Sequence, residues 1–449
     1  MKLVIAVVLP DGSEVAAGEI ESIGSPGRET VEFRYADSFL RNPLAYDLSP
    51  ELRLGSGRFT ASGTRTMLGG ISDAQPDAWG RRLIEFQRKR TARLSGARYT
   101  RATEMDVLAA VPDRTRQGAL RVIADGTYVS HVSAAPQVPE LPDLVEAARA
   151  FEADEEVDGR FLALLDAGSP MGGARPKATV QMNDGNLAIA KLPREGDFGD
   201  AMAWEATALE LARLSGVTVP RFELHRLGDR SVLVIERFDR ADGQRIGYLS
   251  ADSLLVKQQG EITSYTQLAH AMALVSSNPK RDGRELLRRV AVTLLVNNFD
   301  DHMRNHGLLR ERNGWRLSPA FDINPFYRHG TAPSTPISDA DDPSDRDIRN
   351  LLSSSDAFSV SESEALQIIR EVEKVTGNWR SVAAKFGITP EGANAMQAAF
   401  DSPNRDEVER MAPQKRRIPA TSPAGQPREI DGRFGEKSQS VPEVGLEPG

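Results

Sequence analysis

The sequence predicts an α+β protein with a small mixed α/β subdomain, a strand-bearing lobe and a mainly helical lobe. Residues 1–130 alternate β-rich runs such as TVEFRY and GALRVIAD with Gly and Pro turns. A glycine-bearing stretch and two strand-like runs fall within residues 140–238, and helical periodicity dominates residues 239–410. Residues 411–449 are rich in Pro, Gly, Ser and charge, so we expect a disordered tail there.

The composition describes an ordinary globular chain of roughly two to three domains. Of its 449 residues, 40% are hydrophobic and 27% are charged. The chain has no Cys, which excludes disulfides, thiolate zinc sites and cysteine nucleophiles. This fits a reducing compartment, so we expect the protein in the cytoplasm. No apolar run approaches the length that crosses a membrane, and we expect no membrane partner.

The charge distribution limits direct contact with nucleic acid. A net charge of −8 argues against a wide phosphate interface, because such binding depends on many Lys and Arg. Residues 81–101 nevertheless hold eight basic residues and one acid. We interpret this segment as a solvated helix face. The alternative is a patch that helps an assembly sit on DNA or contacts an acidic partner.

Several elements follow from local periodicity. Residues 3–9 are apolar and rich in β-branched side chains, and PDG follows at once, which predicts a hairpin strand rather than a targeting segment. Helical spacing predicts helices at AWGRRLIEFQRKR and PELPDLVEAARAFEADEE. In the second half, YTQLAHAMALVSS, GRELLRRVAVTLLVNNF, SESEALQIIREVEKV and TPEGANAMQAAF predict further helices.

The stretch DAGSPMGGARPKATVQMNDGNLAIAKLP predicts a glycine-rich loop that leads into a hairpin. Gly168, Gly172 and Gly173 leave the backbone free to approach a ligand, and N–H groups in such a loop can cradle phosphate oxygens. ATVQM and LAIAKLP flank the turn signal NDGN and place Lys191 at the end of the second strand. There it is a candidate for contacting nucleotide phosphates, as the strand lysine of a protein kinase does. Alone, Lys191 would also fit an exposed strand end, and the glycines an ordinary loop.

Two acidic residues follow in positions that suit a nucleotide site. Glu205 lies near the start of the predicted helix AMAWEATALELARLSG, where it can pair with Lys191. The alternative is a surface acid in the first turn of that helix. SVLVIERFDR then predicts a buried strand with a polar end. In a two-lobed nucleotide enzyme this is the position of the adenine hinge, so Glu236 and Phe238 would border the base.

The stretch NNFDDHMRNH concentrates two Asp, two His and one Arg in a chain with six His. On a helix, His302 and His306 would share a face and could ligate zinc. Met303 stands where the Glu of a metalloprotease motif would be, and no third ligand is evident nearby, so zinc is disfavoured. Asp300 and Asn305 instead have the Asp-to-Asn spacing of the kinase catalytic loop.

These residues suit phosphoryl transfer. A carboxylate at Asp300 can accept the proton of an attacking hydroxyl, and the amide oxygen of Asn305 can hold magnesium against ATP. Asp322, in PAFDINP after a predicted hairpin at GLLRERNGWRLS, supplies the second metal ligand, as the kinase DFG aspartate does. By itself Asp322 would also fit a turn or cap. The order of all these residues along the chain predicts a kinase.

Up to its tail, the chain resembles the HipA family of toxin serine/threonine kinases in GGARPKA, AKLP, ERFDR, FDDHMRNH and PAFDINP. The resemblance implies a protein-kinase-like two-lobed body with a small mixed N-terminal subdomain. It implies ATP and Mg²⁺ as cofactors, with Asp300 as the catalytic base and Asn305 and Asp322 as metal ligands. The candidate cofactor-binding residues are Lys191, Glu205, Glu236, Phe238, Gly172, Gly173 and His302.

The resemblance also implies partners. The substrate would be a protein, in studied relatives an aminoacyl-tRNA synthetase, whose phosphorylation restrains translation and growth. Family members usually work beside a small helix-turn-helix antitoxin that binds operator DNA, so DNA contact would come mainly through that partner. The alternative is a non-catalytic relative that binds nucleotide or an antitoxin and acts as a scaffold.

The chain departs from the family pattern in two places. Pro170 stands where studied members carry an autophosphorylated serine, with Ser169 just before it, so the resemblance does not extend to self-inactivation by that route. Asp301 stands where relatives commonly have Gly, and Arg304 where they have Lys. Because Arg is a rigid fork and Lys a point charge, the geometry of phosphate contact would change while activity is retained.

Overall fold

The computed structural model describes residues 1–24, 29–61, 63–129, 135–153, 173–258, 260–328, 334–344 and 346–411. Met1–Glu409 form one compact unit and Arg410–Gly449 a second, and the description below concerns the first. Apart from Met411, the tail expected at residues 411–449 lies outside the described residues. The same holds for Gly168, Ser169, Pro170 and Gly172.

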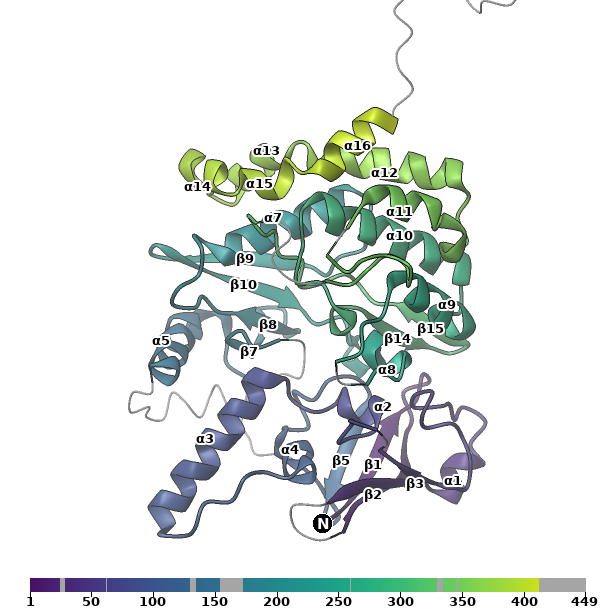
Figure 1. Ribbon diagram of the computed structural model, residues 1–449. Coiled ribbons are helices and arrows are strands. Elements are labelled where there is room, and N and C mark those ends of the chain that lie inside the picture. Colours follow the sequence, from purple (N-terminus) through teal and green to yellow (C-terminus); the bar gives the residue numbers. More distant parts are fainter. Residues whose placement is uncertain are drawn as a thin grey trace, which may run out of the picture. The chain divides into compact units, whose positions relative to one another are not determined.

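An antiparallel sheet of six strands forms the centre of the N-terminal part (Figure 1). Leu3, Ile5 and Val7 alternate along the first strand and are all buried, because alternate side chains share one face. The strand expected at residues 3–9 is therefore confirmed. The order β4-β3-β2-β1-β5-β6 joins β1 (Lys2–Val8), β2 (Glu14–Ile23), β3 (Thr30–Tyr35), β4 (Arg58–Thr60), β5 (Leu120–Ala124) and β6 (Thr127–Tyr128).

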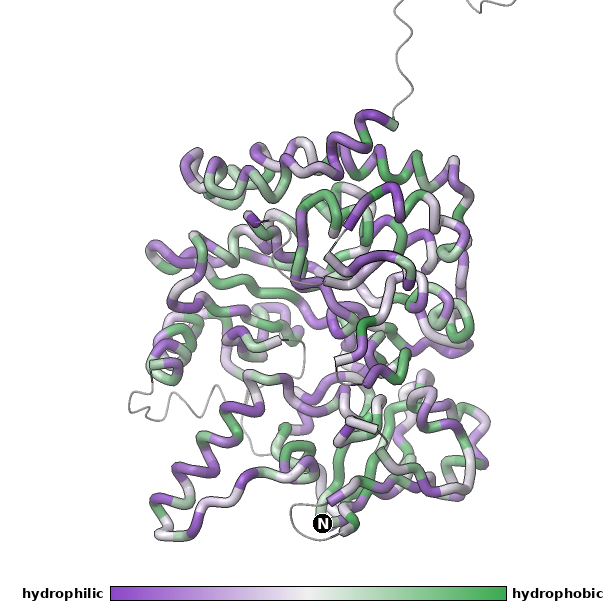
Figure 2. The backbone as a smooth tube through the Cα atoms, in the orientation of Figure 1, coloured by the Kyte–Doolittle hydropathy of each residue, from purple (hydrophilic) through white to green (hydrophobic). Residues whose placement is uncertain are grey.

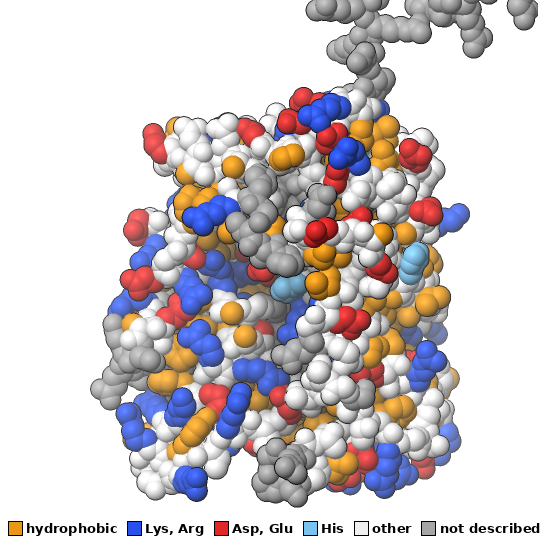
Figure 3. All heavy atoms as spheres, viewed as in Figure 1, with side chains coloured by type: hydrophobic (Ala, Val, Ile, Leu, Met, Phe, Trp, Pro, Cys, Tyr) orange, Lys and Arg blue, Asp and Glu red, His pale blue; other side chains and the backbone are white. Residues whose placement is uncertain are grey.

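The longest helix of this part is α3 (Ala78–Ser95), and Figure 1 shows it reaching away from the six-stranded sheet. It begins at Asp77, whose carboxylate accepts the N–H of Gly80, and ends at Gly96 in the left-handed conformation. Lys and Arg side chains are prominent on the surface in this region (Figure 3), as expected for a solvated basic face. The other helices are α1 (Asp37–Leu40), α2 (Gly69–Ser72) and α4 (Glu104–Ala110).

A second antiparallel sheet follows, and its order is β7-β8-β10-β9. The NDGN turn joins its first two strands, which confirms the predicted hairpin. One face packs against α5 and against Trp79 of α3 in a continuous apolar core, and α7 packs on β10 and β9. The elements are β7 (Lys177–Gln181), β8 (Leu187–Lys191), β9 (Phe222–Leu227), β10 (Arg230–Glu236), η1 (Val138–Glu140), α5 (Leu141–Glu152) and α7 (Ala201–Leu214).

The remaining part is mainly helical and is built around α10, whose second half is almost entirely buried. The hydrophobic colour in Figure 2 marks interior strands and helices, whereas outer turns are hydrophilic. No described helix is both long and apolar enough to span a membrane. The helices are α8 (Ala251–Leu254), α9 (Tyr265–Val275), α10 (Pro279–Leu295), η2 (Met303–Asn305), α11 (Ile348–Ser353), η3 (Ser355–Phe358), α12 (Glu362–Thr376), α13 (Trp379–Lys385), α14 (Pro390–Ala395), α15 (Gln397–Phe400) and α16 (Pro403–Met411).

Short strands connect these helices to the rest of the chain. The predicted hairpin at GLLRERNGWRLS is confirmed and carries a third strand beside it. The single helix expected at TPEGANAMQAAF is wrong, because the chain turns at Met396, whose buried side chain separates two short helices. The strands are β11 (Arg240–Ala241), β12 (Gln244–Arg245), β13 (Tyr248–Ser250), β14 (Gly307–Glu311) and β15 (Gly314–Leu317).

A buried ion cluster ties the N-terminal part to the second sheet. The strand expected at SVLVIERFDR ends at Glu236, and Arg237 then turns inward with no exposed side-chain surface. Arg237 donates two hydrogen bonds to Asp239, at 2.9 and 2.7 Å, and others to backbone carbonyls that precede β5. Asp239 also accepts the N–H of Gly118 at 2.7 Å. Burial acts to raise the pKa of Asp239, but Arg237 and Arg240 outweigh it and hold that pKa well below its usual range.

Candidate active site

The ammonium group of Lys191 lies between two carboxylates that come from distant parts of the chain. Its Nζ is 2.5 Å from Oε1 of Glu205 and 2.7 Å from Oδ1 of Asp322. Lys191 ends β8 and is 7% exposed. Burial acts to lower the pKa of Lys191, but the charges of Asp322 and Glu205 outweigh it and raise that pKa. The lysine is therefore fully charged at neutral pH.

Glu205 occupies the second turn of α7 and is buried, with 1% of its surface exposed. The alternative of a surface acid is therefore wrong. Asp200 begins this helix by accepting the N–H of Ala203, which fixes the turn that carries Glu205 inward. Only one oxygen of Glu205 is bonded to Lys191, and its Oε2 has no hydrogen-bond partner among the described residues.

Asp322 adopts a left-handed backbone conformation, with φ of +59°. Non-glycine residues rarely take it, and such strain concentrates at functional sites. The amide of Asn324 donates to Oδ1 of Asp322 at 2.9 Å and holds the carboxylate in place. Burial acts to raise the pKa of Asp322, but Lys191 outweighs it and lowers that pKa to about 2. Asp322 is therefore an anion under all ordinary conditions.

The loop after α10 carries Asp300 outward and Asn305 inward. Asp300 is exposed, and partial desolvation together with nearby Asp322 and Asp301 raises its pKa, against the opposing charge of His302. Asn305 is 4% exposed, and its amide nitrogen donates to the carbonyl of Asp300 at 3.3 Å. Its amide oxygen is buried and has no partner among the described residues.

Lys191, Asp300 and Asp322 all line one cavity of about 700 Å³. Asn305 is not among the described residues that line it. The volume falls within the range of small-molecule sites. The other lining residues are Gly173, Ala174, Arg175, Lys177, Arg194, Glu195, Gly196, Asp197, Phe198, Ala201, Trp204, Phe299, Asn324, Pro325, Phe326, Tyr327 and Met396.

The described end of the glycine-rich loop is anchored to the N-terminal part. Gly173 has φ of +96°, and its carbonyl accepts Nζ of Lys177 at 3.3 Å. The same Nζ is 2.5 Å from Asp77, the residue that begins α3. Trp79 donates its indole N–H to the carbonyl of Lys177 at 3.0 Å. Sequence reasoning missed Lys177, although its place in GARPKA next to the glycines was a usable signal.

A second, smaller cavity of about 320 Å³ shares Gly173 and Ala174 with the first. His302 lines this second cavity, not the first. Glu236 and Phe238 are not among the described residues that line either one. Glu236 accepts the amide of Asn186 at 2.8 Å, and Phe238 packs against Tyr248 and Phe321. Their contact with adenine stays a prediction.

The geometry on which a zinc site depended is absent from this loop. Met303–Asn305 form a single 3-10 turn, so His302 and His306 do not share a helix face. His306 instead contacts Asp301, with Nε2 at 3.0 Å from Oδ2. The described residues include no group of three or more His, Cys, Asp or Glu that could hold a metal ion.

Asp301 is a buried anchor of the loop, with 5% exposure. Its Oδ2 accepts the hydroxyl of Tyr265 and contacts His306, and Thr335 donates to its carbonyl at 2.8 Å. Burial acts to raise the pKa of Asp301, but His306 and Tyr265 outweigh it and lower that pKa. Asp301 therefore stabilises the loop from inside.

We expect Asp301→Gly to lower the free energy of unfolding by about 1–3 kcal/mol, because it leaves the buried hydroxyl of Tyr265 and the ring of His306 without their partner. Urea denaturation followed by tryptophan fluorescence measures this loss. Asp229→Asn, at an exposed turn, is the control and should change stability little. A variant as stable as the parent would show that Asp301 does not hold the loop.

Comparison with known proteins adds independent findings. Residues 169–379 match the family model described as HipA-like C-terminal domain. The curated protein Y4mE of Sinorhizobium fredii, which is named as a kinase, is 26% identical over 176 residues. That match spans 34% of this chain and 41% of Y4mE, less than half of either protein.

A solved structure extends the comparison to nearly the whole chain. A chain of the Shewanella oneidensis MR-1 toxin–antitoxin complex of HipA, HipB and operator DNA aligns with a TM-score of 0.57. The alignment covers 90% of this chain and 97% of that chain at 15% identity. At this identity the likeness establishes a shared fold, which agrees with the two-lobed α+β architecture expected from the sequence.

Proposed function

Because this chain belongs to the HipA family of kinases, we propose that it transfers the terminal phosphate of ATP to a serine or threonine hydroxyl of a protein. The observation that carries the proposal is the position of Lys191, held between Glu205 and Asp322 at 2.5 and 2.7 Å. A buried ammonium that two anions keep charged is suited to phosphate oxygens, and it lines a cavity of sufficient size.

Lys191 would bind the phosphates and Glu205 would orient it. The pairing with Glu205 fixes the direction of the lysine side chain, so little ordering remains when a phosphate arrives. Arg175 lines the same cavity, and Asp197 holds its guanidinium through two hydrogen bonds at 2.7 and 2.9 Å. The N–H groups near Gly173 would contribute further donors.

Asp300 would orient the attacking hydroxyl and accept its proton. The carboxylate is exposed at the cavity, so a substrate side chain can reach it. Its pKa is raised by partial desolvation and by the nearby charges of Asp322 and Asp301, which makes it a better proton acceptor than an ordinary aspartate. Asp301 does not suit this role, because it is buried and its Oδ2 contacts Tyr265 and His306.

The donor set fits magnesium. Asp322 offers a carboxylate at the cavity wall, and the buried amide oxygen of Asn305 has no protein partner. Hard oxygen ligands of this kind are those that Mg²⁺ takes beside nucleotide phosphates. When bound, the ion would neutralise charge that develops on the transferred group. Lys191, Asp322 and Asn305 would thus hold the phosphate end of ATP.

We further propose that the activity restrains growth as the toxin half of a toxin–antitoxin pair in the cytoplasm. The aligned HipA chain comes from a complex with HipB and operator DNA, which supports an antitoxin partner for this chain. A net charge of −8 suits DNA contact mainly through that partner, a helix-turn-helix protein. The phosphorylated protein would belong to translation, with an aminoacyl-tRNA synthetase as the first candidate.

Transfer of label from γ-labelled ATP tests the proposal directly. We expect the protein to label a discrete band in a cell extract depleted of small nucleotides when Mg²⁺ is present, and to label nothing when EDTA removes the ion. ATP binding without any transfer would overturn the kinase proposal. The chain would then be a HipA-like scaffold that binds nucleotide and antitoxin.

A further inference from the structure

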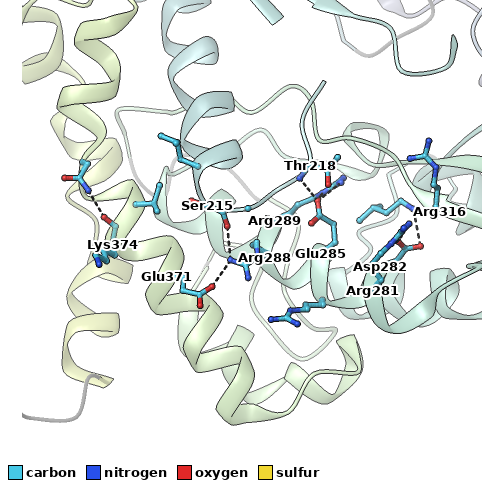
Figure 4. Close-up of a pocket in the computed structure, with 16 residues that line it drawn as sticks. Ser215, Thr218, Arg281, Asp282, Glu285, Arg288, Arg289, Arg316, Glu371 and Lys374 are labelled. Atoms are coloured by element: carbon cyan, nitrogen blue, oxygen red, sulfur yellow. Dashed lines mark hydrogen bonds and ion pairs between the residues drawn. The ribbon is translucent and has the colours of Figure 1, made fainter. Parts of the chain in front are cut away.

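A third cavity, of about 860 Å³, lies on the helical part and shares no lining residue with the Lys191 cavity. Figure 4 shows its walls, which come from the end of α7, from α10, from β15 and from α12. The phosphoryl-transfer chemistry proposed above uses none of these residues. The lining comprises Leu214, Ser215, Gly216, Thr218, Arg281, Asp282, Arg284, Glu285, Arg288, Arg289, Arg316, Leu317, Glu371, Lys374, Val375 and Asn378.

Six basic side chains line this cavity against three carboxylates. Two of the carboxylates are engaged by the protein backbone. Glu285 accepts the N–H of Thr218 at 2.9 Å, and Asp282 accepts the N–H of Leu317 at 3.2 Å. Each also pairs with an arginine of the cavity, Asp282 with Arg281 at 3.3 Å and Glu285 with Arg289 at 3.0 Å. The remaining acid, Glu371, accepts one N–H of Arg288 at 3.1 Å.

The basic residues keep unused donors. Each guanidinium has five N–H groups, and ion pairs with Glu364 and Glu311 occupy only one nitrogen each of Arg284 and Arg316. Lys374 has no ion pair with any described residue. The cavity therefore presents a surplus of positive hydrogen-bond donors.

A buried arginine forms part of the wall. Arg289 is 4% exposed, and its Nε and Nη2 bind Glu285 at 3.2 and 3.0 Å, while its Nη1 has no partner among the described residues. The hydroxyl of Ser215, also 4% exposed, is equally without a partner. A buried donor without a partner costs free energy, so a ligand oxygen that reached it would stabilise the site.

We propose that this cavity binds a small molecule that carries a phosphate or diphosphate group. Guanidinium forks match phosphate oxygens, and several converge here from α10 and β15. Leu214, Leu317 and Val375 give the cavity apolar wall for the organic part of such a molecule. The ligand class follows from these two kinds of surface.

The site is connected to the residue that would hold magnesium, a step that rests on the proposed function. Arg289 donates through Nη2 to the carbonyl of Ser318, and the N–H of Ala320 donates to the carbonyl of Thr218 at 2.8 Å. Asp322 follows two residues later. An anion that draws Arg289 toward the cavity weakens its bond to Ser318, so we infer that ligand binding lowers the affinity for ATP and magnesium.

Inorganic pyrophosphate is the probe for the binding step, titrated calorimetrically into the full chain. We expect Arg281→Gln combined with Arg284→Gln to weaken binding at this cavity about tenfold or more, because each charged hydrogen bond contributes strongly. Both side chains are exposed, so the fold should tolerate the change. Arg230→Gln, an exposed arginine outside the cavity, is the matched control, and Lys191→Met should retain the site.

Binding at this cavity and its coupling to ATP and magnesium are tested by separate measurements. Pyrophosphate binding that is the same in the parent and in the double variant would overturn the site. To test the coupling, the affinity for ATP and magnesium is measured with and without pyrophosphate in the parent and in the double variant. Pyrophosphate can also compete with ATP directly at Lys191, but this competition is the same in both proteins and cancels in the comparison. We expect a larger loss of affinity in the parent, and an equal loss would overturn the coupling. A failure of phosphate transfer alone would overturn the proposed function and leave the binding result intact.

Discussion

Asp300→Asn should abolish most phosphate transfer while the protein still binds ATP. Asn keeps the size of the side chain but cannot accept a proton, and removing a general base typically lowers the rate by about 10²–10⁴-fold. The exposed position of Asp300 means that the fold does not depend on it. Steady-state transfer from labelled ATP, measured beside equilibrium binding of ATP and magnesium, separates the lost rate from any lost affinity.

Asp229→Asn removes an exposed acid from the turn between β9 and β10 and controls for the change in net charge. It should transfer phosphate at the rate of the parent. If Asp300→Asn keeps a rate within a few-fold of the parent, Asp300 is not the base. The assignment of that role from the order of residues along the chain would then be wrong. An equal loss in both variants would point to a general effect of charge instead.

Asp239→Asn should lower the free energy of unfolding by about 3–5 kcal/mol, since it leaves Arg237 and Arg240 inside the protein without their carboxylate. The N–H of Gly118 also loses a charged acceptor. Urea denaturation followed by tryptophan fluorescence is the measurement. The loss should exceed that of any exposed ion pair in this chain.

Asp184→Asn provides the matched comparison, because it breaks the exposed pair between Asp184, in the turn between β7 and β8, and Arg221, just before β9. Water screens an exposed pair, so its contribution to stability is small and this variant should unfold close to the parent. Equal stability losses in the two variants would mean that burial does not strengthen the Asp239 cluster. Apolar packing, rather than the ion cluster, would then hold the N-terminal part against the second sheet.

Local patterns were sufficient to predict the parts of the site that lie on regular elements. The NDGN turn fixed the hairpin that ends at Lys191, and helical spacing placed Glu205 on α7. Burial was harder to foresee, because a glutamate near a helix start is usually exposed and only the packed structure shows Glu205 at 1%. The roles of these residues in binding and catalysis stay predictions.

Long-range contacts explain what sequence reasoning missed. From ERFDR the sequence predicted an adenine hinge with Glu236 and Phe238. The structure shows that Arg237 and Asp239 of the same motif form hydrogen bonds with residues more than 100 positions earlier. Nothing near the motif encodes those partners. The arginine-lined cavity was missed for the same reason, since α7, α10, β15 and α12 contribute to it from separate stretches.

The connection from α3 to the glycine-rich loop has a mechanical consequence. The helix has 18 residues, so it is about 27 Å long, and its first turn is fastened to Lys177 through Asp77 and Trp79. A tilt of about 10° at that end moves the far end of such a rod by about 5 Å. Because Lys177 also donates to the carbonyl of Gly173, the start of α3 is linked to that backbone. A force on the far end of α3 would therefore reach the backbone that lines the Lys191 cavity at Gly173.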